Sequence, residues 1–374
     1  MTARRVIRCA LTQTKNAYLQ MPSQTADLPS LRDKMEDIRM ANVTHNIDLI
    51  AAAAAQGARV ICLGELCTAP YFALYTDPMW LAFAEDAQLG PSITAFRSAA
   101  ETHHMIVIAP IFEADAQSGK RFNTAVVIDE HGEILGKYRK THIPCGQNDR
   151  GSFHETFYYG PSDGNLGPSR ANIARNSYFP VFRTSVGNIG VAICYDRHFE
   201  GVMDSLREGG AELVFCPAIT FGNKSQRVWH EEFRVDAVRH GMFIGGSNRS
   251  GREPPWTIAY FGESYFCGPQ GLCPSIPSPR GLVMADLDLT ELSEPDPSGW
   301  NLPRDIRYDI YSPRTGRTES PPIRRRMPNL PAFWMILNWS GRACAPLSSF
   351  TTAGYSERGM AKGFRPKRRC WAGR

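Results

Sequence analysis

The amino-acid sequence predicts an α/β layered fold, in which helices cover sheets of buried strands. The first observation is that helical stretches alternate with short, continuously apolar runs, such as residues 58–65 and 105–113. Such runs are typical of strands that are buried on both faces. The second observation is composition, because 374 residues with 43% hydrophobic and 21% charged residues are typical of a soluble globular protein with a large core. The alternation of helices and buried strands then indicates the α/β class.

The first half of the chain begins with an apolar run, residues 6–11, that predicts a strand. An alanine-rich stretch over residues 42–56 predicts a helix, which ends at a glycine. The apolar run 58–65 follows and predicts a second strand. A helix over roughly residues 91–104 leads to a third expected strand, residues 105–113.

Two further strands are expected over residues 124–129 and 133–138, because the Glu-His-Gly sequence between them is a hairpin signal. Residues 145–179 are polar and show little apolar periodicity. Loops of this length inside a compact domain are usually functional or mobile.

The second half repeats the pattern, with strands expected over residues 189–194 and 212–217 and helices around residues 199–209 and 225–240. Both Gly-Ala-Arg-Val-Ile-Cys at residues 57–62 and Gly-Ala-Glu-Leu-Val-Phe-Cys at residues 210–216 show a helix stop followed by a strand. This similarity hints at two related halves, although two short matches do not establish a repeat.

The charge of the chain is unevenly distributed. Residues 313–374 hold 13 Lys and Arg against 2 acidic residues, so the net charge of +5 leaves residues 1–312 with 29 basic against 35 acidic residues, or about −6. We expect a folded domain over residues 1–312 and a basic, mostly disordered tail over residues 313–374. Nucleic-acid binding by the main domain is not expected.

The sequence also bears on location and cofactors. No apolar stretch approaches the ~20 residues that cross a bilayer, and the first ten residues lack the apolar core of a secretory signal. We therefore expect a cytoplasmic protein without membrane contact. The ten cysteines include no CxxC pair, which favours reduced thiols and predicts that no metal or other cofactor is bound.

Three reactive side chains stand at the ends of separate apolar runs: Glu65, Lys140 and Cys194. Each has a simpler interpretation when taken alone, as a salt-bridged edge residue, a surface lysine and a small core residue. Together they supply what acyl transfer at a poor electrophile needs. A thiolate attacks, a carboxylate takes and returns the proton, and a cation stabilises the oxyanion.

The motifs around these residues occur in a recognisable order. Gly64-Glu65, then Tyr-Arg-Lys-Thr-His-Ile-Pro at residues 138–144, then Ile-Cys-Tyr-Asp-Arg at residues 193–197 resemble the nitrilase (carbon–nitrogen hydrolase) superfamily in order and spacing. The resemblance covers about residues 5–310. It implies a four-layer α-β-β-α sandwich, a homo-oligomer of two or more subunits and a Glu-Lys-Cys triad.

The resemblance assigns roles to these positions. Glu65 would be general base and acid, and Cys194 would be the nucleophile. Lys140 would stabilise the tetrahedral intermediate, with help from the backbone N–H of Tyr195. Glu155 matches a second glutamate of the family, which positions the lysine and the substrate.

The expected substrate-binding residues are Arg197, Tyr195 and His142. A guanidinium three residues after the nucleophile suits bidentate capture of a substrate carboxylate. The alternative for Arg197 is an ion pair that ties down a loop, with Asp196, Asp236 or Glu200 as the partner. The histidines at positions 142, 154 and 198 are expected to donate or accept hydrogen bonds and not to titrate during catalysis.

Within the superfamily, the sequence is most similar to the β-ureidopropionases, which act in pyrimidine degradation. This implies hydrolysis of an N-carbamoyl amino acid, with N-carbamoyl-β-alanine favoured, to the amino acid, CO2 and NH3. Asp196 instead resembles the D-carbamoylases, so they, N-carbamoylputrescine amidases and ω-amidases stay open as alternatives. A non-catalytic member that binds a partner is the alternative from a different class.

Overall fold

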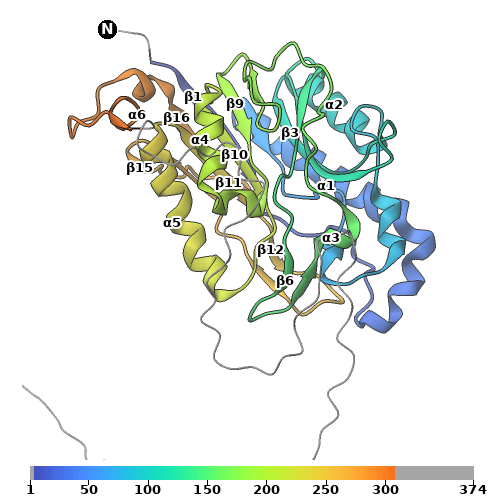
Figure 1. Cartoon of the computed structure of the whole chain (residues 1–374). Helices are drawn as coiled ribbons and strands as arrows, with labels where there is room; N and C mark the ends of the chain where they lie inside the picture. The colour runs from blue at the N-terminus through green and yellow to red at the C-terminus, as the bar shows by residue number, and fades with distance from the viewer. Residues whose placement is uncertain (1–3, 308–374) are drawn as a thin grey trace, which may run out of the picture.

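Two six-stranded sheets form the centre of the protein, as shown in Figure 1. The structure is a computed structural model that describes residues 4–307, so the predicted tail over residues 313–374 lies outside the described residues. Each sheet has three parallel strands at its centre and antiparallel strands at its edges. The two halves therefore share one arrangement of strands.

The first sheet has the strand order β16-β1-β2-β3-β4-β5. Strands β1, β2 and β3 are parallel, whereas β16, β4 and β5 run antiparallel to their neighbours. The strands are β1 (Val6–Thr12), β2 (Val60–Cys62), β3 (Ile106–Ala114), β4 (Arg121–Ile128), β5 (Ile134–Arg139) and β16 (Leu282–Asp288).

The second sheet has the strand order β15-β14-β11-β10-β9-β8. Its parallel strands are β9, β10 and β11, so β10 occupies the place that β2 has in the first sheet. The strands are β8 (Val181–Arg183), β9 (Asn188–Val191), β10 (Leu213–Ala218), β11 (Phe243–Asn248), β14 (Tyr265–Gly268) and β15 (Gly271–Leu272).

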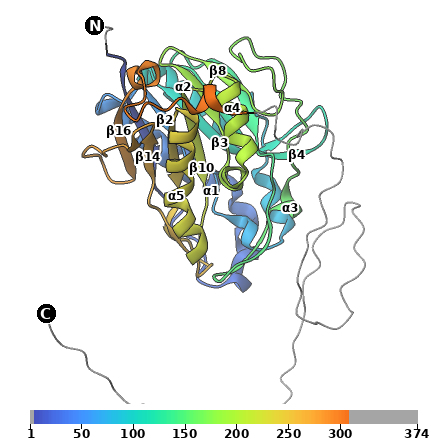
Figure 2. The same cartoon turned by 60° about the vertical axis from the view of Figure 1, so that its left-hand side comes forward.

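Helices cover the outer faces of the two sheets. Helices α1 (Met35–Ala55) and α2 (Pro91–His103) lie on one side of the molecule in Figure 1, and α4 (Glu200–Glu208) and α5 (Asn223–His240) lie on the other. In Figure 2, α5 lies toward the viewer with β10 behind it. The order of layers is helix, sheet, sheet, helix, which confirms the four-layer sandwich.

The side chains of the central strands point alternately into the two apolar layers on either side of the sheet. In β2, Val60 and Cys62 belong to the apolar core between the sheets, whereas Ile61 packs with the core beneath α1 and α2. Successive strand residues point to opposite faces, so a strand between two apolar layers must be apolar at every position. This is why the run around β2 is continuously apolar.

Short elements connect the layers. Two small hairpins stand outside the main sheets, β6 (Cys145–Gln147) with β7 (Ser152–His154) and β12 (Ser250–Arg252) with β13 (Ala259–Phe261). The short helices are α3 (Glu155–Tyr158) and α6 (Leu302–Asp305), and the 3-10 helices are η1 (Thr25–Lys34), η2 (Phe72–Leu74), η3 (Pro78–Phe83), η4 (Cys194–His198) and η5 (Leu289–Ser293).

The structure confirms most predicted elements and corrects several bounds. The predicted strand over residues 58–65 is only three residues long, because the chain leaves the sheet after Cys62. Helix α1 begins at Met35 and not at residue 42. Strand β9 ends at Val191, so Cys194 begins η4 instead of ending the strand.

Two further findings concern the cysteines and membrane spans. Cys9, Cys62, Cys67, Cys194, Cys216, Cys267 and Cys273 are free thiols, as predicted. Across residues 4–307, no helix combines the length and the apolarity needed to cross a membrane.

Candidate active site

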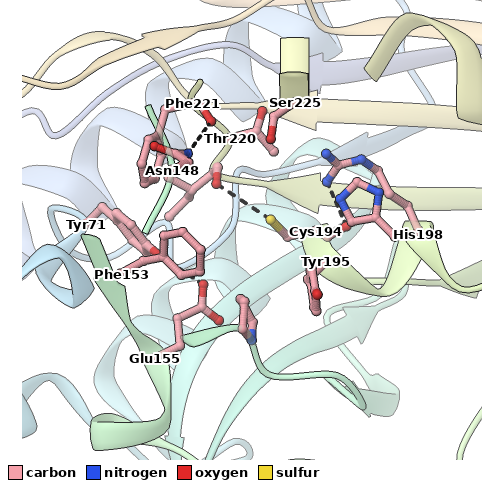
Figure 3. A pocket seen from close by; sticks show the side chains of 13 residues that line it. Tyr71, Asn148, Phe153, Glu155, Cys194, Tyr195, His198, Thr220, Phe221 and Ser225 are labelled. Atoms are coloured by element: carbon pink, nitrogen blue, oxygen red, sulfur yellow. Dashed lines mark hydrogen bonds between the residues drawn. The ribbon is translucent and has the colours of Figure 1, made fainter. Parts of the chain in front are cut away.

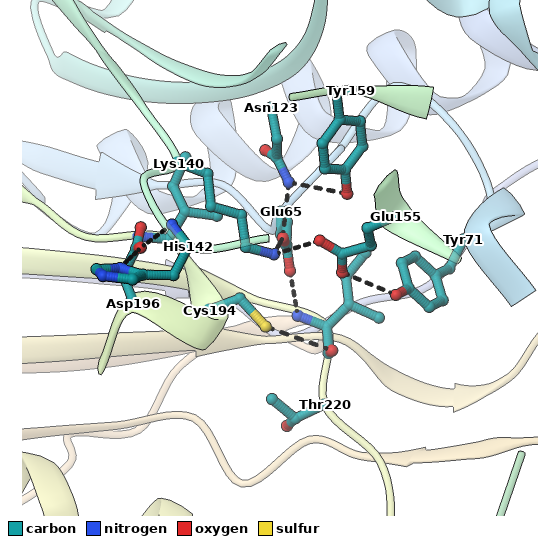
Figure 4. A network of polar contacts seen from close by, with 12 residues as sticks. Glu65, Tyr71, Asn123, Lys140, His142, Glu155, Tyr159, Cys194, Asp196 and Thr220 are labelled. Atoms are coloured by element: carbon teal, nitrogen blue, oxygen red, sulfur yellow. Dashed lines mark hydrogen bonds and ion pairs between the residues drawn. The ribbon is translucent and has the colours of Figure 1, made fainter. Parts of the chain in front are cut away.

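The three predicted reactive residues meet at one edge of the sandwich. Glu65 lies three residues beyond β2, Lys140 follows β5 directly, and Cys194 begins η4 three residues beyond β9. Figure 4 shows their side chains converging, together with that of Glu155 from the start of α3. Two strands of the first sheet and one of the second thus bring these groups together.

Lys140 stands between two carboxylates. Its Nζ donates to Glu65 Oε1 at 2.9 Å and to Glu155 Oε2 at 2.7 Å. The residues Lys140 and Glu65 are fully buried, and Glu155 is 2% exposed. Burial of charge is costly unless the charges are paired and hydrogen-bonded, and each of these three side chains is.

Glu65 is held by donors from three parts of the chain. Besides Lys140, Asn123 Nδ2 donates to its Oε1 at 2.8 Å, and the backbone N–H of Ile219 donates to its Oε2 at 2.7 Å. Both carboxylate oxygens are therefore fixed in direction before any substrate binds.

The thiol of Cys194 contacts the same residue, Ile219, that binds Glu65. Its Sγ lies 3.6 Å from the carbonyl oxygen of Ile219, the residue whose N–H binds Glu65. Cys194 has a backbone φ of +50°, a left-handed conformation that is unfavourable for a side chain with a Cβ. Strained backbone of this kind persists where surrounding contacts enforce it and clusters at functional sites.

The charges of the cluster shift the pKa values of its members. Burial disfavours the Lys140 ammonium, but the carboxylates of Glu155 and Glu65 raise its pKa well above the ordinary lysine value. Burial and the charge of Glu65 raise the pKa of Glu155, against the effect of Lys140. Burial and the charge of Glu65 also raise the pKa of Cys194 to about 12. At neutral pH the site therefore holds an ammonium and a protonated thiol.

A cavity of about 140 Å³ opens onto the thiol, as shown in Figure 3. Cys194 and Glu155 line it, whereas Glu65 and Lys140 lie behind them and are not part of its wall. The other lining residues are largely aromatic or polar: Tyr71, Pro144, Asn148, Phe153, Tyr195, Arg197, His198, Ile219, Thr220, Phe221 and Ser225.

Two of the three predicted substrate-binding residues, Arg197 and Tyr195, line this cavity. The guanidinium of Arg197 donates from Nε to Glu232 Oε2 at 3.1 Å and from Nη1 to the carbonyl oxygen of Cys194 at 2.9 Å. Its ionic partner is thus Glu232, on α5, and none of the three acidic residues considered from the sequence.

The third, His142, lies elsewhere. It is not among the lining residues of the cavity. Its Nδ1 lies 2.8 Å from Asp196 Oδ1, and its ring stacks on Phe199 with centroids 3.7 Å apart. This carboxylate and ring hold the imidazole outside the wall of the cavity, so the described cavity gives the expected substrate contact no support.

Several residues of the site were missed by sequence reasoning. Asn123 and Ile219 bind Glu65, and the hydroxyl of Tyr71 donates to Glu155 Oε1 at 2.9 Å. None of these has a motif of its own. Asn148 and Phe153 lie within the long polar segment that the sequence marked as functional, which was the available signal for them.

The arrangement can support acyl transfer. A thiol beside a cavity, a buried carboxylate and a permanently charged ammonium are the groups for attack, proton transfer and oxyanion stabilisation. Among residues 4–307, no group of three or more His, Cys, Asp or Glu side chains is placed to hold a metal ion.

Comparisons with known proteins agree with this geometry. The family model described as carbon-nitrogen hydrolase matches residues 15–294. A β-ureidopropionase of Arabidopsis thaliana is 31% identical over 325 residues, covering 82% of this chain and 72% of the relative. An N-carbamoylputrescine amidase of Oryza sativa subsp. japonica is 28% identical over 290 residues, covering 74% of this chain and 89% of the relative.

A similar fold occurs in the crystal structure of a carbon-nitrogen hydrolase from Helicobacter pylori G27. It matches with a TM-score of 0.64 and 24% identity, covering 82% of this chain and 97% of that one. At this identity the likeness concerns the fold alone. The family model and the relatives, together with the fold, show that the chain belongs to the carbon–nitrogen hydrolase family of the nitrilase superfamily and is a hydrolase of carbon–nitrogen bonds.

Proposed function

We propose that the protein hydrolyses an N-carbamoyl amino acid, with N-carbamoyl-β-alanine favoured, to the amino acid, CO2 and NH3. The observation that carries the proposal is that Cys194 and Arg197 line one cavity, backed by Lys140 between Glu65 and Glu155. A thiol and a guanidinium in the same cavity suit a substrate with a carbamoyl group at one end and a carboxylate at the other.

The first step in this proposal is attack by Cys194 Sγ on the carbamoyl carbon. The thiol is protonated in the resting site because burial and Glu65 raise its pKa to about 12. Glu65 therefore takes the thiol proton as the S–C bond forms. The Lys140 ammonium and the backbone N–H of Tyr195 stabilise the oxyanion, each contributing about 3–4 kcal/mol.

The tetrahedral intermediate then collapses. Glu65 returns the proton to the terminal nitrogen, the C–N bond breaks and ammonia leaves, so that the rest of the substrate stays on Cys194 as an S-carbamoyl group. Glu65 next takes a proton from water, whose oxygen attacks the same carbon. The thiol and a carbamate are released, and the carbamate decomposes to CO2 and the free amino acid.

A second candidate is an amide without a carboxylate, such as N-carbamoylputrescine. One observation favours it. Glu232 lies 3.1 Å from Arg197 and also 2.6 Å from His198 Nδ1, so a carboxylate already partly neutralises the guanidinium. The relatives include enzymes named for both substrate types.

The test is ammonia release by the purified protein from N-carbamoyl-β-alanine, N-carbamoyl-α-amino acids and N-carbamoylputrescine. We expect the highest kcat/KM with N-carbamoyl-β-alanine, and Cys194→Ala should retain less than about 1% of the activity without loss of thermal stability. Preference for N-carbamoylputrescine would support the second candidate, and an active Cys194→Ala variant would refute the nucleophile.

The variant Arg197→Gln tests the carboxylate contact separately. It should raise KM for N-carbamoyl-β-alanine by about 10-fold or more, with a much smaller effect on a neutral amide. Equal losses on both substrates would mean that Arg197 acts through its bond to the Cys194 carbonyl.

A further inference from the structure

Asp196 is a buried carboxylate that the proposed mechanism does not use. It lies two residues after Cys194 and is fully buried. Its Oδ1 accepts from Thr141 Oγ1 at 2.7 Å and from the backbone N–H of His142 at 2.9 Å. Its Oδ2 accepts from Tyr138 Oη at 2.6 Å and from the backbone N–H of Ile193 at 3.2 Å.

These donors belong to the two segments that carry the reacting groups. Tyr138, Thr141 and His142 flank Lys140, whereas Ile193 directly precedes Cys194. Asp196 therefore spans from the turn that holds the thiol to the segment that holds the ammonium. Figure 4 shows Asp196 beside His142, with Lys140 and Cys194 nearby.

Asp196 also closes the strained turn. Its own backbone N–H donates to the carbonyl oxygen of Ile193 at 3.0 Å, while its side chain accepts from the N–H of that residue. Both bonds enclose Cys194, whose φ of +50° has to be enforced by its surroundings.

The nearby cations are engaged elsewhere. Lys140 donates to Glu65 and Glu155, and Arg197 donates to Glu232. The contacts of Asp196 are hydroxyl groups, backbone N–H groups and the His142 ring. Burial and Asp196 raise the pKa of Tyr138 well above the ordinary tyrosine value, so its hydroxyl keeps the proton that it donates.

We propose that Asp196 is a positioning residue that sets the placement of the Cys194 thiol relative to the Lys140 ammonium. His142, with its ring against Asp196 and Phe199, supports this carboxylate and does not touch the substrate. The inference rests on the proposed function only in that Cys194 and Lys140 are the reacting pair.

The main test is Asp196→Asn in the full-length protein. An asparagine has the same size but has an NH2 donor in place of one accepting oxygen, so at least one backbone N–H of Ile193 or His142 faces a donor. We expect kcat to fall by about 10-fold or more, with KM within about threefold of wild type. A residue that only supports overall folding would not produce this split in a variant with an unchanged thermal midpoint.

A second readout does not depend on the substrate. Iodoacetamide alkylation of Cys194, followed on its peptide by mass spectrometry, should be slower by about threefold or more in Asp196→Asn at fixed pH, because the thiol moves away from the ammonium that favours its ionisation. If the wild-type protein releases no ammonia from any N-carbamoyl substrate, the proposed function fails, while the alkylation rates still decide the role of Asp196.

Asp236→Asn is the matched control. Asp236 is a buried aspartate on α5 whose charged neighbours, Arg239 and His240, are 3.7 and 3.9 Å away, and it contacts neither reacting segment. The Asp236→Asn variant should therefore have the kcat and the alkylation rate of wild type. Equal losses in both variants, or wild-type values in a folded Asp196→Asn, would overturn the proposal.

Two milder variants decide the question if Asp196→Asn does not fold. Tyr138→Phe and Thr141→Val each delete one hydroxyl donor to Asp196 and leave the other donors in place. A severalfold fall in kcat in both, with the thermal midpoint retained, supports the proposal. Wild-type kcat in both would contradict it.

Discussion

Arg139 and Lys140 are consecutive residues, yet they enter two different buried clusters of charge. Arg139 donates to both oxygens of Glu113, at 2.8 and 2.6 Å, and Lys137 Nζ donates to the same carboxylate at 2.5 Å. Lys140 donates to two carboxylates, those of Glu65 and Glu155. Consecutive side chains at the end of a strand point to opposite faces, which separates the two clusters.

The pKa of the buried carboxyl group distinguishes the clusters. Two cations surround Glu113, and although burial opposes its ionisation, their hydrogen bonds and charges lower the pKa of that carboxyl. Two carboxylates share Lys140, and burial together with Glu65 raises the pKa of Glu155. Arg139 also contacts the less buried carboxylates of Asp163 and Asp115, at 3.3 and 3.5 Å, so the first cluster has no excess of cations. The second cluster differs in that its carboxylates lie beside a thiol and a cavity.

The comparison teaches that burial and pairing alone do not mark an active site. Arg139 is as buried as Lys140, and its guanidinium also packs over the ring of Phe122, 3.8 Å from the centroid. The proposed catalytic cluster is the one that lies next to a cavity and contains a buried carboxyl group with a raised pKa.

The largest effect is expected on the activity when Glu65, in the cluster around Lys140, is replaced. Glu65→Gln keeps an oxygen for the Lys140 and Asn123 donors but cannot take the thiol proton. We expect kcat/KM to fall by about 1,000-fold, with Tm within about 3 °C of wild type. Ammonia release and thermal denaturation measure the two quantities. If the variant keeps more than a tenth of the wild-type activity, the proposed catalytic role of the Lys140 cluster is wrong.

The same substitution in the other cluster should act on stability. Glu113→Gln removes the buried carboxylate that binds Arg139 and Lys137, and leaves Arg139 with the more distant carboxylates of Asp163 and Asp115. We therefore expect a loss of about 3 kcal/mol in the free energy of unfolding. The activity of the folded fraction should stay within about threefold of wild type. Urea unfolding and active-site titration measure these, and a large loss of kcat would contradict the structural role.

The pH dependence of that loss has a defined sign. Because the pKa of Glu113 is lowered below 4.5, its stabilisation is present above that pH and disappears as the pH falls through the folded-state pKa. The difference between wild type and Glu113→Gln should therefore be full at about pH 7 and shrink below about pH 4.

The smallest effect on stability is expected at Glu155, with the opposite sign. Its pKa is raised, so the ionised carboxylate costs stability as the pH rises through the folded-state pKa, and an amide avoids that cost. Glu155→Gln should be more stable than wild type by about 1 kcal/mol at neutral pH while turning over more slowly. Urea unfolding as a function of pH measures the gain in the free energy of unfolding, which should vanish in acid. If the variant is less stable than wild type at neutral pH, the Glu155 carboxylate stabilises the fold, as that of Glu113 is expected to do.

Part of the fold could be predicted from local sequence patterns. The main helices and the strands β2, β3 and β10 could be predicted because these strands are continuously apolar and the helices between them have stop signals. Among the strands of the two main sheets, β8, β11, β14, β15 and β16 were not predicted. Strand β16, for example, pairs with β1, which is far away in the sequence, and no local pattern specifies such pairing.

The candidate site shows the same division. The short motifs around Glu65, Lys140 and Cys194 predicted which residue types would be brought together. The ionic partner of Arg197 could not be predicted, because Glu232 lies 35 residues further along the chain on a helix of the outer layer. The contact of His142 with Asp196 could not be predicted either, because 54 residues separate the two in the sequence.

The sequence by itself determined the class of the protein: the alternation of buried strands and helices, and a carboxylate, an ammonium and a thiol at strand ends. Only the tertiary structure decided that Arg139 enters a separate cluster around Glu113, and that Asn123 and Ile219 donate to Glu65. The reason is that apolar periodicity and short motifs are local properties of the chain. The balance of charge in a buried cluster is instead set by which distant segments the packed sheets bring within hydrogen-bonding distance.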